Sequence, residues 1–372
     1  MHTVLQTLWD PAGATRRELE ARLDLSRPTV DKAIGELRRL GLVGPVGTRS
    51  LRAGRPATVF RLDGGVRVAV GVDLELPQFS FVLSDLWEEP LHQATRSVAS
   101  GPDDPVSLLR YVTDELTEWL DALRVPWSRV AGVGVALPAF VRNGVANFVG
   151  EAMPSWRGVT ARETLERDLP VPVHVHHDTH LMALAEARAA GWTDGVLLYF
   201  ALRPGLHGDV RFGASLVLDG RPYRGAHGHG GSLYRAFVSG EELSGLGAKK
   251  RVALLVERAG GPLVHAVTLF DPGRVVIHAE MLGEQEPLFI EGCRRRLREA
   301  LAGEFPDTLK VAPAEERGPT AALGAAIAVV QDLYEDPALL LASGGETGKK
   351  ASGQGEARER QKQLERRFMC VS

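Results

Sequence analysis

The sequence predicts an α/β protein that begins with a winged helix-turn-helix, and three observations support this fold class. Two short amphipathic helices with cap and stop signals occupy residues 15–40. A segment rich in glycine and proline follows them, between two short apolar runs that suit strands. From residue 66 onward, apolar strand-like runs alternate with helical periodicity, which is the order expected of a sheet covered by helices.

The helix pair is defined by its caps. Thr15 is followed three residues later by Glu18, so the hydroxyl and the carboxylate can each satisfy a free amide of the first turn. Ser26 is the expected N-cap of a second helix over residues 27–40, and its side-chain oxygen is expected to accept from the amides ahead. Gly41 supplies the stop signal for that helix. The local pattern therefore predicts a helix, a turn and a second helix.

The second helix has an apolar face and a polar face. Its apolar residues recur at helical spacing: Val30, Ile34 and Leu37. Three short or cationic side chains face outward at its N-terminal end, and such groups reach base edges and phosphates in a major groove: Arg27, Thr29 and Lys32. We therefore interpret residues 27–40 as a recognition helix. A plain helical hairpin with a solvated charged face is the alternative.

The segment after the helices is interpreted as a wing. Residues 42–43 and 58–62 can form its two strands. Between them lie Arg52 and Arg55, the latter in a Gly-Arg-Pro tripeptide that can present an extended arginine to a narrow minor groove. An ordinary interdomain linker is the alternative. We predict that Arg52 and Arg55 contact DNA together with the three helix residues.

Charge is distributed unevenly along the chain. Residues 1–62 hold eleven Lys or Arg and six Asp or Glu, a balance of +5, whereas the 372-residue chain has a net charge of −3, so the remainder carries −8. A basic front end suits contact with phosphates, while the rest of the chain does not attract them. No apolar run approaches the roughly 20 residues of a membrane span, and the N-terminus lacks a signal-peptide pattern. We expect no membrane association and a cytoplasmic location.

Strand and helix patterns alternate through the body of the chain. The sequence segments that suit strands include VAVGVDL, FSFVLSD, VPVHVHHD and RVVIHAEM, and helical periodicity appears at residues 105–123, 254–269 and 321–333. The Gly-, Ser- and charge-rich end of the chain suits a mobile tail. We predict three parts: a DNA-binding domain over 1–63, an α/β body over 64–340 and a flexible basic tail over 341–372.

The chain resembles the ROK group of repressors and sugar kinases in its repressor arrangement. The resemblance is carried by GRPATVFRL, VAVGVDL, SDLWEEPL, GVGVALPAF, MPSWRGV, the strand VPVHVHHD with the helix around ALAEARAAG, GASLVLDGRPYRGAHGHGG, FDPGRVVI and AALGAA. It implies a winged helix-turn-helix followed by a two-lobed, actin-like or ribonuclease H-like body of the sugar-kinase type.

The sequence departs from the kinases of this group where they hold phosphate. Kinases carry Asp-x-Gly-Gly-Thr in the first hairpin, whereas here Asp73 is followed by Leu-Glu-Leu-Pro. A carboxylate repels nucleotide phosphates, and the missing glycines no longer permit close backbone contact. The second phosphate loop reads RPGLHGDVR, and the late glycine cluster is replaced by His-Ala-Glu at 278–280. Asp178 matches the family's catalytic base, but we judge it inactive because phosphoryl transfer depends on positioned phosphates. An N-cap role for Asp178 is the alternative.

The positions that contact sugar and zinc are altered as well. The resemblance places Ser232 where the group has Glu and Arg235 where it has His, and the zinc-bearing His/Cys segment is missing. Seven of the eleven histidines lie between residues 174 and 229. His174 and His176 alternate with valines as an ordinary strand face does, so we predict no metal site and no cofactor. A metal or anion pocket is the alternative. The candidate effector pocket consists of His177, Asp178, His227, His229, Ser232 and Arg235.

These observations favour a DNA-binding transcriptional regulator of the repressing kind that binds a double-stranded operator as a homodimer. Its body would act as a dimerisation platform and as a sensor of a small, sugar-like effector, without kinase activity. The competing interpretation is a sugar kinase that phosphorylates a hexose or an amino sugar with ATP. A third is a body that serves as a scaffold and binds no ligand.

Overall fold

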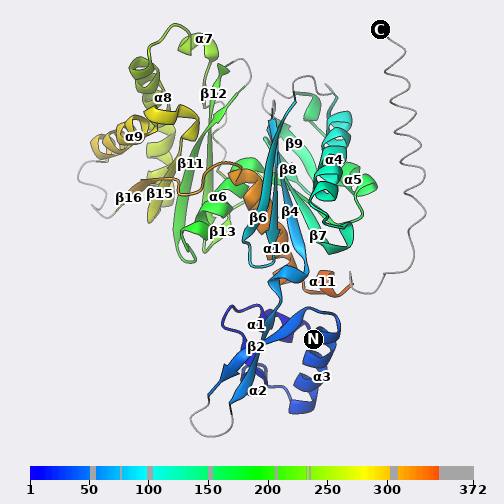
Figure 1. Cartoon of the computed structure of the whole chain (residues 1–372). Coiled ribbons are helices and arrows are strands. Elements are labelled where there is room, and N and C mark those ends of the chain that lie inside the picture. The colour runs from blue at the N-terminus through cyan, green and yellow to red at the C-terminus, as the bar shows by residue number, and fades with distance from the viewer. Residues whose placement is uncertain are drawn as a thin grey trace, which may run out of the picture.

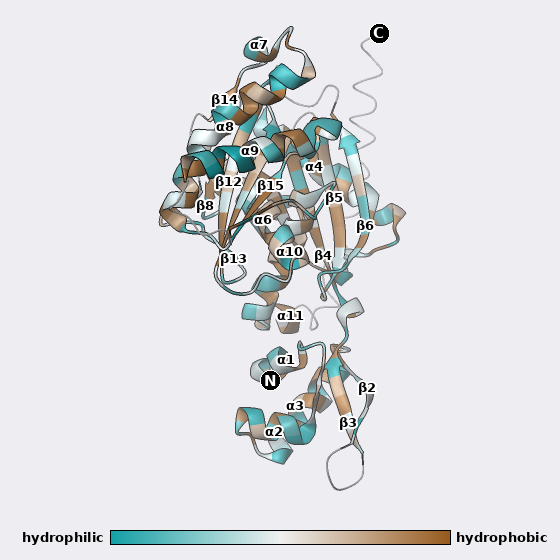
Figure 2. Ribbon diagram, turned by 90° about the vertical axis from the view of Figure 1, so that its left-hand side faces the viewer, coloured by the Kyte–Doolittle hydropathy of each residue, from teal (hydrophilic) through white to brown (hydrophobic). Residues whose placement is uncertain are grey.

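The computed structural model describes residues 1–50, 56–75, 78–98, 104–149, 154–205, 208–231, 233, 236–301 and 309–342. Figure 1 shows a small N-terminal unit below a larger body, in which two sheets stand side by side. Hydrophobic residues gather in the strands of the body, whereas α2 (Arg16–Leu23) in the N-terminal unit is largely hydrophilic (Figure 2).

The N-terminal unit contains three helices and a three-stranded antiparallel sheet in the order β1-β3-β2. Besides α2, its elements are α1 (His2–Leu8), α3 (Arg27–Arg39), β1 (Ala14–Thr15), β2 (Val43–Arg49) and β3 (Ala57–Leu62). Helices α2 and α3 and strand β3 lie where the sequence predicts them, whereas the first predicted strand, at residues 42–43, overlaps β2 only at Val43. Helix α1 and strand β1 were not predicted from the sequence, and β2 is longer than predicted.

The caps of the helix pair differ in one detail from the prediction. The Thr15 hydroxyl accepts from the Glu18 amide at 3.3 Å, and the Glu18 carboxylate accepts from the Thr15 amide at 2.8 Å, so the predicted capping box is present. Ser26 occupies the N-cap position of α3, but its side chain accepts from no amide of the helix. Its Oγ instead lies 2.8 Å from Oγ1 of Thr29. Ser26 is therefore the N-cap residue, as predicted, but the predicted hydrogen bond from a helix amide to its side chain is absent.

Lobe 1 is built on a five-stranded sheet in the order β10-β7-β4-β5-β6. Its strands are β4 (Val68–Glu75), β5 (Gln78–Asp85), β6 (Pro90–Ser97), β7 (Val130–Leu137) and β10 (Val173–His177). One face packs against α4 (Pro105–Ala122) and α5 (Ala161–Asp168) around a large apolar core. The hairpin of β8 (Ala139–Arg142) and β9 (Val145–Val149) forms a separate two-stranded sheet that shares the core of lobe 1.

Lobe 2 is built on a second sheet in the order β13-β12-β11-β15-β16, with β14 beside β12. Its strands are β11 (Val196–Pro204), β12 (Val210–Leu218), β13 (Arg221–Pro222), β14 (Phe237–Val238), β15 (Arg274–His278) and β16 (Lys310–Pro313). Its outer face packs against α8 (Ala248–Phe270) and α9 (Glu286–Ala300), with the short α7 (Gly240–Leu243) near the end of β14.

Two buried helices, α6 (Asp178–Ala189) and α10 (Thr320–Glu335), lie between the sheets (Figure 1). Glycines on both sides allow α10 to approach without a gap. A Cβ added to Gly71 on β4 would lie 1.8 Å from the Ala322 carbonyl oxygen of α10. A Cβ added to Gly324 on α10 would lie 1.9 Å from the Leu181 carbonyl oxygen of α6. The absence of a Cβ at Gly71 and Gly324 therefore allows the close contacts of α10 with β4 and with α6.

The N-terminal unit shares a hydrophobic core with the body. Buried residues of α1 and of β3 belong to one cluster with residues from lobe 1, α10 and α11 (Ala338–Ala342), among them Leu86, Val330 and Leu340. The Trp9 indole donates to the Leu86 carbonyl at 3.2 Å and meets Tyr334 edge to face, with ring centroids 5.7 Å apart. Arg61 lies over the Trp87 ring at 5.3 Å. The two parts are thus joined by packing and not by the chain connection alone.

Two sequence predictions concern the outer parts of the body: the absence of an apolar span and the tail over 341–372. The 23-residue α8 is long and apolar enough to cross a membrane by length and composition alone, although the sequence analysis found no such run. One face of this helix packs on the lobe 2 sheet, and core helices of other proteins pass the same test, so this is weak evidence for a span. Of the predicted tail over 341–372, residues 343–372 lie outside the described residues.

Candidate functional site

The outward residues of α3 lie on the surface of the N-terminal unit. Val30, Ile34 and Leu37 are fully buried, as the helical spacing predicts. Arg27, Thr29 and Lys32 are exposed at or near the first turn, and the side chain of Arg27 is 77% exposed. Arg52 and Arg55 of the predicted wing lie outside the described residues. The three helix residues are thus accessible near the start of α3.

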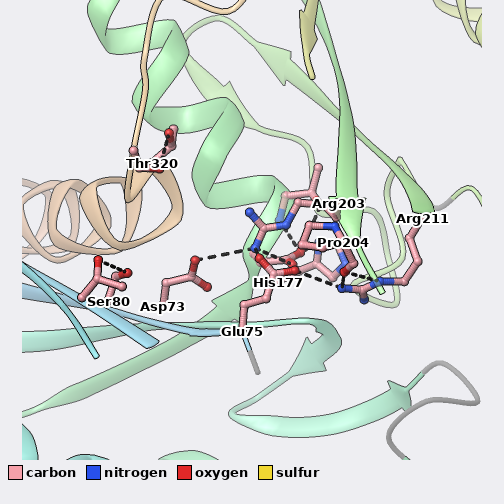
Figure 3. Close-up of polar contacts among 12 residues, drawn as sticks. Asp73, Glu75, Ser80, His177, Arg203, Pro204, Arg211 and Thr320 are labelled. Carbon is pink, nitrogen blue, oxygen red and sulfur yellow. Dashed lines mark hydrogen bonds and ion pairs between the residues drawn. The ribbon is translucent and has the colours of Figure 1, made fainter. Parts of the chain in front are cut away.

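A largely buried cluster of charges joins the two lobes. It consists of Asp73, Glu75, Asp178, Arg203 and Arg211, and we call it the interlobe cluster. The first two carboxylates lie on the last residues of β4 in lobe 1, and Asp178 begins α6. The two arginines extend from β11 and β12 of lobe 2, and Figure 3 shows the Arg203 guanidinium directed at the carboxylates of the other lobe.

Arg203 is the centre of this cluster. Its Nη2 atom lies 3.6 Å from Oδ2 of Asp73 and 3.5 Å from Oδ2 of Asp178, and it forms a close ion pair with Oε2 of Glu75. The side chain of Arg203 is only 12% exposed. Arg211 adds an ion pair of 3.0 Å to Oε1 of Glu75 and donates to the Pro204 carbonyl at 2.8 Å. Two guanidinium groups therefore form ion pairs with three carboxylates.

The surplus of carboxylates shifts their protonation. Burial, together with the charge of Asp178, raises the pKa of Asp73 to about 6 against the pull of Arg203. Burial and the neighbouring carboxylates also raise the pKa of Glu75 to about 7. Burial opposes ionisation of Asp178 too, but His177, Arg203 and the hydrogen bonds from Thr179 outweigh it and lower the pKa. Asp178 is therefore the carboxylate of the cluster that stays ionised most readily.

Burial also disfavours the charge of Arg203, yet the three carboxylates outweigh this effect and raise its pKa. The guanidinium consequently remains charged and acts as an internal counter-ion.

Asp178 is the first residue of α6 and the N-cap position falls on His177, so the alternative N-cap role for Asp178 is wrong by one residue. Its Oδ1 accepts from the amide of Thr179 at 2.5 Å.

Two of the predicted effector-pocket histidines meet through an aromatic ring. Phe140 of β8 is stacked between His177 and His229, with ring centroids 4.3 Å and 4.8 Å away. His180 of α6 also holds the loop that carries His229, because the Nε2 atom of His180 lies 2.7 Å from the Gly230 carbonyl oxygen. His227 is exposed on the same loop. Ser232 and Arg235 lie outside the described residues.

The remaining histidines of the central segment do not converge on a common ligand. A ring nitrogen of His174 lies 2.6 Å from the Asp332 carboxylate on α10. His176 is buried with its Nε2 unpartnered, and burial lowers its pKa to about 3. Among the residues that the structure describes, no group of three or more His, Cys, Asp or Glu side chains is arranged to hold a metal ion.

Sequence reasoning did not identify Arg203, Arg211 or Phe140 as parts of a site. The two arginines were visible only as the ends of the altered phosphate loop at residues 203–211. Alternation along β11 places Tyr199, Ala201 and Arg203 on the face that packs against α6 and α10, and an arginine on such a buried face signals an internal ion pair. No local pattern distinguishes Phe140 from a core residue.

The two sheets with α6 and α10 between them define a two-lobed α/β protein of the sugar-kinase-like class. Residues 70–234 match the model of the ROK family. This match agrees with the resemblance to the ROK group that the sequence motifs carry.

Related chains and structures extend this comparison. An uncharacterized protein of Sinorhizobium fredii is 27% identical over 323 residues, which is 77% of this chain and 80% of that protein. The xylose repressor of Caldicellulosiruptor bescii is 23% identical over 231 residues, which is 62% of this chain but only 56% of the repressor. These two similarities cover most of the chain at low identity.

Solved structures show the same fold. A ROK family transcriptional regulator described as a homolog of the E. coli MLC protein superposes with a TM-score of 0.68 at 18% identity and covers 92% of this chain and 99% of its own. A ROK family glucokinase from Streptomyces griseus, in complex with glucose and AMPPNP, superposes with a TM-score of 0.55 at 17% identity over 71% of this chain and 99% of its own. Both regulators and kinases therefore share the architecture of the body.

Proposed function

We propose that this protein is a DNA-binding transcriptional regulator of the ROK type, a repressor whose body transfers no phosphate. The observation that carries the proposal is the exposed N-terminal end of α3, where Arg27, Thr29 and Lys32 are accessible while Val30, Ile34 and Leu37 are buried. Cationic and hydroxyl side chains at the start of a helix that follows a tight turn suit insertion into a major groove. In this proposal, residues 1–63 form a winged helix-turn-helix domain, and Arg52 and Arg55 of its wing contact DNA.

The interlobe cluster supports a body without kinase activity. The kinases of the family place glycines beside the nucleotide phosphates, whereas this chain places the Glu75 carboxylate there, paired with Arg203 and Arg211. An anionic nucleotide would have to displace buried ion pairs that the lobes already share. Asp178 lies beside Arg203, and its lowered pKa makes it a weak base.

Three features of the regulator follow from this proposal. The named repressors among the relatives favour an operator of double-stranded DNA and a sugar-like effector. We place the effector site at the loop that His177, Phe140 and His229 bring against α6, next to Asp178, and we include His227, Ser232 and Arg235 in it. A homodimer would place two copies of α3 on a palindromic operator in the cytoplasm.

DNA binding is tested with the full chain and a duplex library that carries 30 randomised base pairs. After rounds of selection and sequencing, affinity for the enriched duplex is measured by fluorescence anisotropy at several salt concentrations. Arg27→Ala and Lys32→Ala should weaken binding, and Lys32→Ala should reduce the salt dependence by about one phosphate contact. Arg295→Ala, which removes an exposed arginine from α9, is the matched control. Unchanged affinity in both α3 variants would contradict the proposal.

The competing function is a sugar kinase, and one observation favours it: Asp178 is retained at the start of α6 and is ionised. Incubation of the protein with ATP, Mg²⁺ and a panel of hexoses and amino sugars, followed by measurement of ADP, separates the two functions. We expect no turnover above the background of an Asp178→Asn variant. Turnover that this substitution abolishes would establish the enzyme instead.

A further inference from the structure

A carboxylate stands among the predicted DNA contacts of α3. Asp31 lies next to Lys32 and one turn after Arg27, and its side chain is 45% exposed. Its Oδ1 atom lies 2.5 Å from Nε of Arg16, and its Oδ2 atom lies 3.8 Å from Nε of Arg27. The surface that presents cations to DNA therefore also presents a negative charge, and that charge is paired on both sides.

Arg16 fixes this carboxylate from the side of the core. It is the first residue of α2, and its guanidinium lies over the ring of Phe60 at 4.5 Å. Phe60 is 3% exposed on β3, where it pairs with Ala14. The aromatic ring contacts Arg16, Arg16 pairs with Asp31, and Arg27, whose side chain is 77% exposed, lies near the same carboxylate. A guanidinium stacked on an aromatic ring loses little further freedom when it pairs with a carboxylate.

A fixed carboxylate discriminates among base pairs. It only accepts hydrogen bonds, so it suits the exocyclic amino groups of cytosine and adenine in the major groove. Guanine O6 and N7 and thymine O4 are acceptors, and they would face it without a donor. The same negative charge repels phosphates and weakens binding to DNA of any sequence. Asp31 would thus reduce non-specific affinity and favour one kind of base edge.

We propose that Asp31 determines the sequence specificity of the DNA contact, and that Arg16 is the residue that positions it. The recognised group is an exocyclic amino group of cytosine or adenine in the major groove. This inference rests on the proposed DNA-binding function of α3. An ion pair that only braces α2 against α3 is the structural alternative, and it predicts a change of stability without a change of sequence preference.

The test uses the full chain and the duplex library with 30 randomised base pairs. Selection is carried out with the natural protein, Asp31→Asn, Arg16→Met and Arg16→Lys. Affinity is then measured for the enriched duplex and for a shuffled duplex of the same composition. Asp31→Asn should lower the ratio of the two affinities by about tenfold, the size of one lost base-edge contact. The shuffled duplex should bind more tightly, because a repulsive charge is gone, and the preference at one base pair should change.

Arg16→Met should lower the same ratio by a smaller factor, since Asp31 remains but is no longer held. Arg16→Lys should restore most of the ratio, because a cation again pairs with the carboxylate. Glu36→Gln changes another carboxylate of α3, nearer its C-terminal end, and should leave the ratio unchanged. Thermal unfolding by circular dichroism verifies that each variant is folded, and Asp31→Ser replaces Asp31→Asn if the amide variant is not.

The result that overturns the inference is a folded Asp31 variant that selects the natural sequence with the natural ratio of affinities. In that case the proposed DNA-binding function stands, and the Asp31 pair only braces the two helices. A natural protein that enriches no sequence and retains neither duplex at low salt would instead overturn the proposed function, and the inference with it.

Discussion

The side-chain amide of Gln6, on α1, donates a hydrogen bond to the main-chain carbonyl of Tyr334, 2.9 Å away in the last turn of α10. The same turn is bound by both lobes through two further residues: Asp332 lies 2.6 Å from His174 of lobe 1, and Glu335 lies 2.6 Å from Arg221 of lobe 2. The last turn of α10 is thus the place where the N-terminal unit and the two lobes meet. The orientation of α3 relative to the body depends on this turn and on the apolar core around it.

We expect Trp9→Ala to separate the unfolding of the N-terminal unit from that of the body. The indole is buried among residues of both parts, and its removal leaves a cavity and an unpaired Leu86 carbonyl, a loss of about 3–5 kcal/mol. Urea unfolding followed by far-ultraviolet circular dichroism should show one transition for the natural protein and two for the variant. Tyr334→Phe keeps the edge-to-face contact and is the control. A single, unshifted transition in Trp9→Ala would show that the shared core does not couple the two parts.

Gly71→Ala should destabilise the protein by at least about 2 kcal/mol, because the new methyl group would overlap the Ala322 carbonyl of α10. The backbone of α10 cannot yield easily, since Gly324 holds it equally close to α6. Gly35→Ala is a matched control for which we expect a change of stability in the opposite direction. Gly35 lies in the middle of α3 with open space around it, so alanine should stabilise that helix by about 0.5–1 kcal/mol. Chemical denaturation of both variants tests the contrast, which disappears if Gly71→Ala is as stable as the natural protein.

The parts of the structure that the sequence predicted are those with local causes. The capping box of Thr15 and Glu18 and the apolar spacing of α3 depend on residues within a few positions of one another, and both are present. The helix α1 also has helical spacing, at Val4, Leu5 and Leu8, but its apolar face is buried by strands and helices from distant parts of the chain. A single sequence gives no sign of that burial.

The candidate site was predictable only in part for the same reason. Asp73 and Asp178 could be matched to a family pattern, and the altered glycine loop indicated a lost phosphate site. Arg203, which neutralises both carboxylates, lies on a different strand far along the chain, and no spacing relates it to them. Strand pairing and the packing of α6 between the lobes create that contact. Long-range ion pairs of this kind require the fold.

Arg203→Met should cost about 3–5 kcal/mol of stability at pH 8, because it leaves the buried carboxylates of Asp73, Glu75 and Asp178 without their shared counter-ion. The loss should be smaller at pH 5, where the raised pKa values of Asp73 and Glu75 allow both to be protonated. Arg211→Met removes a more exposed arginine with one carboxylate partner, and its effect should be smaller at both pH values. Equal losses for the two variants would show that Arg203 is not the central counter-ion.

Asp73→Asn tests the surplus charge of the interlobe cluster. The pKa of Asp73 is about 6 in the folded protein and 3.8 without the fold, so between these values the folded state binds more protons than the unfolded state. The free energy of unfolding therefore falls as the pH rises from about 4 to about 6, by up to about 3 kcal/mol from this group. Asparagine has a similar shape and no charge, so the variant should lose this fall.

At pH 8 Asp73→Asn should be at least as stable as the natural protein, since two guanidinium groups then serve two carboxylates. Denaturation at pH 4.5, 6 and 8 provides the measurement. His176 acts in the opposite sense, because its lowered pKa of about 3 makes stability fall as the pH drops below 6.5, so the comparison is made as a difference between the two proteins at each pH. A difference that stays constant across the three pH values would show that Asp73 does not titrate in this range.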